Sequence, residues 1–233
     1  MFDITIVGGG HAGVEAAYIA SQFKDLKISI ITLPNVGLAS APCNPAIGGV
    51  GKGQVVRELD ALGGIIGKLA DISGIQFRVL NESKGYAVQS TRIQIDKDRY
   101  SENAEKILLS IPNISIIKEK VEGIKSVDNG FEIQTESSTW NTKKVIMTVG
   151  TFLNGKIHTG EIQKEAGRID CESSNSLASF FGEIKTLGGR FKTGTPARIY
   201  KDTVDYEKLD IQESDPAVNT FHVLHGTKSR FLD

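Results

Sequence analysis

Cysteine, tryptophan and long apolar runs are scarce in this chain of 233 residues. Two cysteines, Cys43 and Cys171, are too few for a disulfide framework, which favours a cytosolic protein with free thiols. No apolar stretch is long enough to cross a bilayer, and a strand pattern begins at once, so we expect neither a membrane span nor a secretory signal. A net charge of -1 excludes the field of a general nucleic-acid binder. We expect a cytoplasmic protein.

What the chain does have is a glycine motif close to residue 1. An apolar strand over residues 3–7 leads into Gly8-Gly9-Gly10-His11-Ala12-Gly13, and helix-forming residues follow. This order is typical of a dinucleotide-binding site. Gly8 would allow the tight turn, Gly10 would let the backbone approach a pyrophosphate, and Gly13 would let the helix pack close to its strand. The N–H groups at the helix start would bind the phosphates. The competing interpretation is an ordinary turn between a strand and a helix.

The glycine motif opens a βαβ unit, with a helix expected over residues 10–23 and a parallel strand over 27–32. The second strand ends on Thr32, where NAD-type sites carry an Asp or Glu for the ribose. This unit therefore does not decide between NAD and FAD.

The rest of the sequence predicts an α/β fold with a parallel sheet, and its composition of 39% apolar and 24% charged residues is that of a globular protein. The segment 34–53 is expected to be an irregular, glycine-rich functional loop. Helices are expected at 54–62, 65–73, 96–109 (with Asp96 as N-cap) and 174–181, and strands at 76–80, 114–118, 121–127, 131–136 and 144–149. A turn at Asp128-Asn129-Gly130 predicts a hairpin.

Three segments together resemble one protein family. They are Gly8–Gly13, the run Cys43-Asn44-Pro45-Ala46-Ile47-Gly48-Gly49 with Gly51-Lys52-Gly53, and Lys192-Thr193-Gly194-Thr195-Pro196. The sequence is similar to the amino-terminal part of the MnmG (GidA) family, which builds carboxymethylaminomethyl groups on the wobble uridine of certain tRNAs. The similarity runs from Phe2 to about Arg198. Ala197 departs mildly from the family pattern, family members are more than twice as long, and Asn219–Asp233 shows no match to the family.

The resemblance implies a Rossmann-like FAD-binding domain of the glutathione-reductase type. We expect it over residues 1–200, incomplete relative to the family, with helices on both faces of the sheet and a small inserted antiparallel β element around 113–143. An irregular segment, 201–233, would follow. The residues implied to bind FAD are Gly8, Gly9, Gly10, His11, Ala12, Gly13, Val121 and Ser174.

The resemblance also implies a catalytic thiol, Cys43, and several partners. MnmE, a GTPase that handles a folate one-carbon donor, would act with the chain on tRNA. NADH would reduce the flavin through a region that lies beyond this chain in the family. The full-length family is expected to form homo-oligomers.

The residues around Cys43 allow a reactive thiol without the family. Pro42 and Pro45 restrict the backbone, and Lys52 with a helix start near Gly53 would lower the pKa of the thiol. A buried structural cysteine is the competing interpretation, and it is our interpretation of Cys171. The glycine-rich loop from Gly48 to Gly53 is either a phosphate cradle or a flexible loop.

Other polar residues give weaker signals. The four histidines lack metal-ligand spacing, so we expect no metal, and His11 is expected to pack or to contact a cofactor. A basic surface for tRNA is one interpretation of Arg57, Lys84, Arg92, Lys97 and Arg99. Interleaved acidic residues and the lack of an aromatic stacking platform favour solvated salt-bridge faces instead.

Two rival functions stay open: a nucleotide-binding module without catalysis, and another flavin-dependent oxidoreductase.

Overall fold

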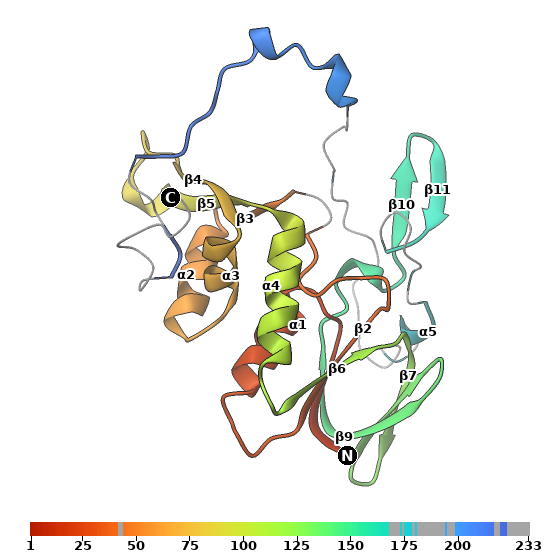
Figure 1. Cartoon of the computed structure of the whole chain (residues 1–233). Coiled ribbons are helices and arrows are strands. Elements are labelled where there is room, and N and C mark those ends of the chain that lie inside the picture. Colours follow the sequence, from red (N-terminus) through yellow and green to blue (C-terminus); the bar gives the residue numbers. More distant parts are fainter. Residues whose placement is uncertain are drawn as a thin grey trace.

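A six-stranded sheet forms the centre of the computed structural model, which describes residues 1–41, 44–167, 173, 175–178, 180, 194, 199–216 and 220–222 (Figure 1). The strand order is β6-β2-β1-β9-β8-β7. The bounds are β1 Phe2–Val7, β2 Ile28–Thr32, β6 Ile114–Lys118, β7 Val121–Val127, β8 Gly130–Thr135 and β9 Thr139–Met147. β6, β2, β1 and β9 are mutually parallel, whereas β8 and β7 continue the sheet antiparallel. The sheet confirms the predicted α/β class.

One predicted strand has a different place from the expected one. Residues 114–118 were expected within the inserted antiparallel element, but β6 pairs in parallel with β2 in the main sheet. All five residues of β2 are buried, as expected for an interior strand, and such a strand needs a hydrogen-bonding neighbour on each side. The antiparallel element therefore begins at Val121, and its β7–β8 hairpin turns at the predicted place, where Val127 pairs with Gly130.

Apolar side chains cover both faces of the central sheet. On one face Ile6, Ile28 and Ile30 pack with Val14 and Ala17 of helix α1 (His11–Ala20), which ends earlier than the expected residue 23. On the other face Val7 and Ile31 form a smaller cluster that includes Leu177 of α5 (Asn175–Ala178). The interior strand β2 and the second half of β1 are thus buried on both faces, whereas β6 and β9 keep exposed residues.

A second, antiparallel sheet was largely missed by the sequence analysis. Its order is β3-β5-β4, with β3 Ala46–Gly48, β4 Gly74–Leu80 and β5 Ser90–Ile95. β3 lies inside the segment that was expected to be irregular, and β5 was not predicted at all. Phe77, Ile93 and Ile47 face the core, together with side chains of the helices α2 (Gly53–Ala61) and α3 (Ile66–Ile72), both of which confirm predicted helices.

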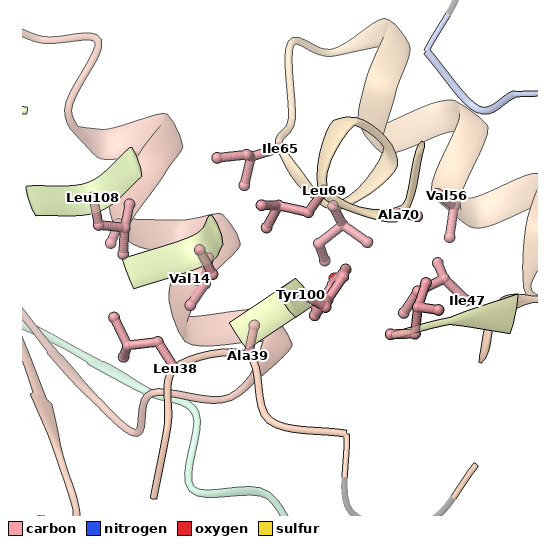
Figure 2. Close-up of a cluster of buried hydrophobic side chains, with 14 of the residues drawn as sticks. Val14, Leu38, Ala39, Ile47, Val56, Ile65, Leu69, Ala70, Tyr100 and Leu108 are labelled. Carbon is pink, nitrogen blue, oxygen red and sulfur yellow. The ribbon is translucent and has the colours of Figure 1, made fainter. Parts of the chain in front are cut away.

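Helix α4 (Lys97–Leu109) lies between the two sheets (Figure 1). Its N-cap is Asp96, as predicted, and the side chain accepts hydrogen bonds from the N–H groups of Asp98 and Arg99. Tyr100 lies among Val14, Leu69 and Ala70 in the cluster that joins α1, α3 and α4 (Figure 2). One continuous core therefore fixes the second sheet to the first.

The remaining elements are short. They are the 3-10 helices η1 (Tyr86–Val88), η2 (Gly150–Phe152), η4 (Lys201–Thr203) and η5 (Tyr206–Lys208), and the hairpin of β10 (Lys156–Thr159) and β11 (Ile162–Glu165). α5 falls within the helix predicted at 174–181. In the part of the chain that is described, no helix has the length and apolarity of a membrane span.

Candidate functional site

A cavity of about 310 Å³ opens at the carboxyl ends of β1 and β2, beside the residues that follow β9. The chain leaves β1 toward β2 on one side and returns through β9 on the other, so the cavity lies at a topological switch point of the sheet, the usual ligand site of open α/β sheets. Its walls include the glycine turn, the end of β2, Val121 and residues 148–152.

The glycine turn has the backbone geometry that the motif predicts. Gly8 has a φ of +112°, and a Cβ there would overlap the carbonyl oxygen of Thr148. A Cβ on Gly13 would overlap the carbonyl oxygen of Gly8, so only glycine lets α1 lie this close to β1. A Cβ on Gly10, by contrast, would meet no atom within 4 Å. The turn is therefore closed to any side chain at Gly8 and Gly13, whereas it is open, with free space beside the backbone, at Gly10.

The open position coincides with the start of α1. Gly10 is the N-cap, no side chain caps the helix, and its first turn carries no acidic residue. His11 and Ala12 line the cavity. Uncapped N–H groups and the positive end of the helix dipole suit an anionic ligand such as a phosphate group.

Thr148, the residue directly after β9, supports the turn, and the sequence analysis did not assign it a role. Its hydroxyl lies 3.0 Å from the carbonyl oxygen of Val7 and 2.9 Å from that of Gly8. Its backbone N–H donates to the carbonyl oxygen of Val7 at 2.8 Å. The available signal was the position of Thr148 directly after an apolar strand, where polar residues often serve a site at the carboxyl edge.

Glu119 is a second wall residue that the sequence analysis missed. Its carboxylate accepts hydrogen bonds from the hydroxyl of Thr135, from Ser138 Oγ at 3.2 Å and from Trp140 Nε1 at 3.2 Å. The Thr135 hydrogen bond, with support from the others, lowers the pKa of the Glu119 carboxyl. A fixed negative charge thus lies in the cavity wall, in a fold whose second strand ends on the uncharged Thr32.

His11 is held in its neutral form by its surroundings. Burial lowers the pKa of the imidazole, and Nε2 has no hydrogen-bond partner among the described residues. The ring lies 5.6 Å from that of Tyr100, whose hydroxyl also lacks a partner within the described part of the chain. Burial raises the pKa of the Tyr100 phenol. A neutral imidazole at the turn fits packing or a cofactor contact.

The structure brings some of the expected site residues together. Val121 is 6% exposed and lines the same cavity as Gly8–Ala12. Cys43, Ser174 and Cys171, with most of the segment Lys192–Pro196, lie outside the described residues. Their roles stay predictions, as does binding of a cofactor at the glycine turn.

Four of the five basic residues form no salt bridge of the expected kind among the described residues. Within the described ranges no ion pair involves Arg57, Lys84, Arg92 or Lys97. Arg57 instead donates to Thr91 Oγ1 at 2.9 Å and lies over the ring of Phe221.

No group of three His, Cys, Asp or Glu side chains suited to a metal occurs in the described part.

Comparison with known proteins gives a consistent set of relatives. The sequence model of the family described as "Glucose inhibited division protein A" matches residues 3–230. Proteins named "tRNA uridine 5-carboxymethylaminomethyl modification enzyme MnmG" from Nitratiruptor sp. and Campylobacter fetus are 46% and 44% identical over 219 and 216 residues. Each match covers 92% of this chain, and 34% and 35% of the two relatives.

A solved structure agrees with the sequence matches. The structure of Aquifex aeolicus GidA superimposes with a TM-score of 0.86 at 42% identity, covering 94% of this chain and 37% of that one. The chain spans about a third of the length of the curated relatives that it matches. The expectation that nothing in Asn219–Asp233 matches the family was wrong, because the family match continues to residue 230.

Proposed function

We propose, because this chain belongs to the MnmG (GidA) family, that it binds FAD and acts in 5-carboxymethylaminomethyl modification of the wobble uridine of tRNA. One observation carries the cofactor assignment. The glycine turn is closed at Gly8 and Gly13 but open at Gly10, where the uncapped start of α1 borders the cavity. A pyrophosphate fits there, since the backbone can approach it without a side chain between them.

The cavity suits the adenosine diphosphate part of FAD. Its volume of about 310 Å³ is at the small end of the range for ligand sites. The N–H groups at the start of α1 would hold the phosphates, and His11, which burial favours in its neutral form, would add no charge of its own. Glu119 and Thr32, which both line the cavity, would accept hydrogen bonds from the adenosine part. They would take the place of the carboxylate that NAD-type sites carry at the end of the second strand. Bound FAD supplies hydride transfer, and the protein supplies orientation.

The reductant, the partner protein and the substrate of the family are also part of the proposal. NADH would be the reductant, MnmE would deliver the folate-derived carbon, and tRNA in the cytoplasm would be the substrate. Cys43 would assist attack on the uracil ring, a role carried by its place in the family motif. If nucleoside analysis finds the same modified uridine after Cys43→Ser, that role is rejected.

The visible spectrum of the purified chain tests the FAD assignment. We expect oxidised flavin to stay with the protein through gel filtration. Gly10→Ala should lose it while the fold stays intact, since the new Cβ meets nothing in the free protein. Gly85→Ala is the matched control, because Gly85 also has negative φ and open space around its Cβ. Equal flavin retention in the wild type and Gly10→Ala would contradict the site.

A second candidate is favoured by the length of the chain, which spans about a third of its relatives. In that case the chain is a FAD-binding module that needs the rest of a family protein for catalysis. Wobble-uridine analysis of tRNA incubated with the flavin-loaded chain, MnmE, a folate donor and NADH separates the two. Modified uridine supports the enzyme, and bound flavin without modification supports the module.

A further inference from the structure

The turn that joins β4 to β5 holds an aromatic ring in solvent two residues after Lys84, so the expectation that no aromatic side chain stands beside the basic residues was wrong at this place. Tyr86, in η1, is 91% exposed, the largest exposed fraction among the exposed large hydrophobic side chains of the described chain. The ring stands on a turn in which Asn81 to Val88 are all exposed. The hairpin 81–89 forms one end of the second sheet (Figure 1), and its base is tied to α2 by a hydrogen bond from Gln54 Nε2 to the carbonyl oxygen of Gln89 at 3.4 Å.

This exposed turn is nevertheless well ordered by its own hydrogen bonds. Asn81 Nδ2 donates to the carbonyl oxygen of Val88 at 3.2 Å, and Gln89 Nε2 donates to the carbonyl oxygens of Glu82 and Lys84, both at 3.2 Å. Backbone bonds from Lys84 to Asn81, Val88 to Gly85 and Gln89 to Tyr86 close the turn. The tyrosine is therefore presented on a preorganised support, and binding through it needs little further ordering of the backbone.

The turn carries one charge of each sign near the ring. Lys84 is exposed two residues before Tyr86 and has no ion pair within the described ranges, and Glu82 is the acidic side chain of the same turn. A second exposed lysine, Lys52, lies in the loop after β3. That loop is tied to the base of the hairpin, since Ser90 Oγ donates to the carbonyl oxygen of Gly49 at 2.6 Å.

We propose that the hairpin 81–89 is an RNA-contact element in which Tyr86 stacks on an unpaired base and Lys84 neutralises a neighbouring phosphate. An exposed aromatic ring beside an unpaired cation is the combination that recognises single-stranded RNA, because every base offers a stacking face and every nucleotide a phosphate. The ligand is single-stranded, since a base within a duplex cannot reach the ring. This inference rests on the proposed function, which supplies an RNA substrate with a modified base in a loop.

The chain offers a close control for this element. Tyr206 and Lys208 also stand two residues apart on a 3-10 turn, and Tyr206 is 63% exposed. There, however, Lys208 is neutralised by an ion pair with Asp205 at 2.7 Å. Substitutions at Tyr206 remove an exposed ring of the same kind from a turn that lacks the unpaired cation.

Binding of a fluorescein-labelled tRNA anticodon stem-loop with an unpaired wobble uridine tests the proposal, with fluorescence anisotropy read over a salt series. We expect Tyr86→Ala to weaken binding about fivefold or more, and Tyr86→Phe, which keeps the stacking face, to bind like the wild type. Lys84→Gln should reduce the slope of log affinity against log salt by about 0.7, the value for one lost contact to a single strand. Tyr206→Ala should change neither quantity.

The flavin spectrum of each variant, read in parallel, separates this inference from the proposed function. A wild-type chain that binds the stem-loop no more tightly than Tyr86→Ala, while all variants keep FAD, overturns the RNA-contact assignment and leaves the cofactor assignment intact. A wild-type chain that keeps FAD but binds no RNA overturns both the contact and the tRNA part of the proposed function. Loss of flavin from the wild type contradicts the cofactor assignment alone.

Discussion

The backbone N–H of Phe221 lies 2.8 Å from Oδ1 of Asp71, a residue 150 positions earlier in the chain. His222 donates its own N–H to the other oxygen of the same carboxylate, and its Nδ1 lies 2.7 Å from Oδ1 of Asp60. The Phe221 side chain is 1% exposed and belongs to the main core. The end of the described chain is thus part of the structural unit that contains α2, α3 and the second sheet.

Residues 212–216 attach the same region to the edge of the second sheet. The N–H of Asp215 donates to the carbonyl oxygen of Phe77 at 2.9 Å, and the carboxylate of Asp215 accepts from the N–H of Val79 at 2.5 Å. The segment covers part of the free edge of β4, which would otherwise expose unpaired backbone groups.

Phe221→Ala should destabilise the protein by about 3 kcal/mol, since it removes a fully buried aromatic side chain and leaves a cavity. Urea unfolding followed by circular dichroism measures the change. Tyr200→Ala, which removes an aromatic side chain that is 85% exposed, is the control and should change the stability little. Equal stabilities of the Phe221 variant and the control would show that residues 220–222 do not hold the second sheet in place.

Glu15 should contribute to stability through the start of α3. Its carboxylate accepts hydrogen bonds from the N–H of Ile65 at 3.0 Å and of Ile66 at 3.0 Å, although burial raises the pKa of the carboxyl. Glu15→Ala would leave these buried donors without an acceptor and should lower the free energy of unfolding by about 2 kcal/mol. Thermal unfolding beside the exposed control Glu122→Ala checks this. A matching melting temperature for both variants would contradict it.

The parts of this fold that the sequence predicted are those with a local cause. The φ of Gly8 and the tight approach of Gly13 are properties of adjacent residues, and Asp96 caps a helix that starts one position later. The second sheet has no comparable signal. β3 is three residues long and lies in a glycine-rich segment, and its pairing of Ile47 with Ile93 joins distant parts of the chain.

Pairing between distant segments also places the site residues that the sequence did not predict. Thr148 reaches the glycine turn only because β9 pairs with β1 across more than a hundred residues, and Glu119 reaches the cavity because β6, which it follows, lies beside β2. The contact of Phe221 with Asp71 has the same non-local origin, and the polar sequence around Phe221 carries no periodicity that predicts burial. Tertiary pairing, not local propensity, places these residues.

Acid should destabilise the protein through His11. Burial lowers the pKa of His11 in the folded protein below the ordinary 6.5. Just below pH 6.5 the unfolded chain therefore binds a proton at this imidazole, whereas the folded chain does not. The stabilisation from a neutral His11 is complete above pH 6.5 and is lost as the pH falls from 6.5 through the lowered pKa. Nuclear magnetic resonance titration of the imidazole measures this directly. His158, which is exposed, serves as the internal comparison. A His11 midpoint at or above 6.5 would contradict the sign.

Thr148→Val should weaken FAD binding more than it weakens the fold. The hydroxyl of Thr148 lies within hydrogen-bond distance of the carbonyl oxygens of Val7 and Gly8, and so fixes the turn that carries the open Gly10. Valine keeps the shape and removes the hydroxyl, which should cost about 1 kcal/mol of stability. Because the lost bond orients the phosphate-binding turn, the dissociation constant of FAD should rise by several-fold, measured by flavin fluorescence titration. Thr148→Ser keeps the hydroxyl and should bind FAD like the wild type. If the serine and valine variants bind FAD equally, the hydroxyl does not position the turn.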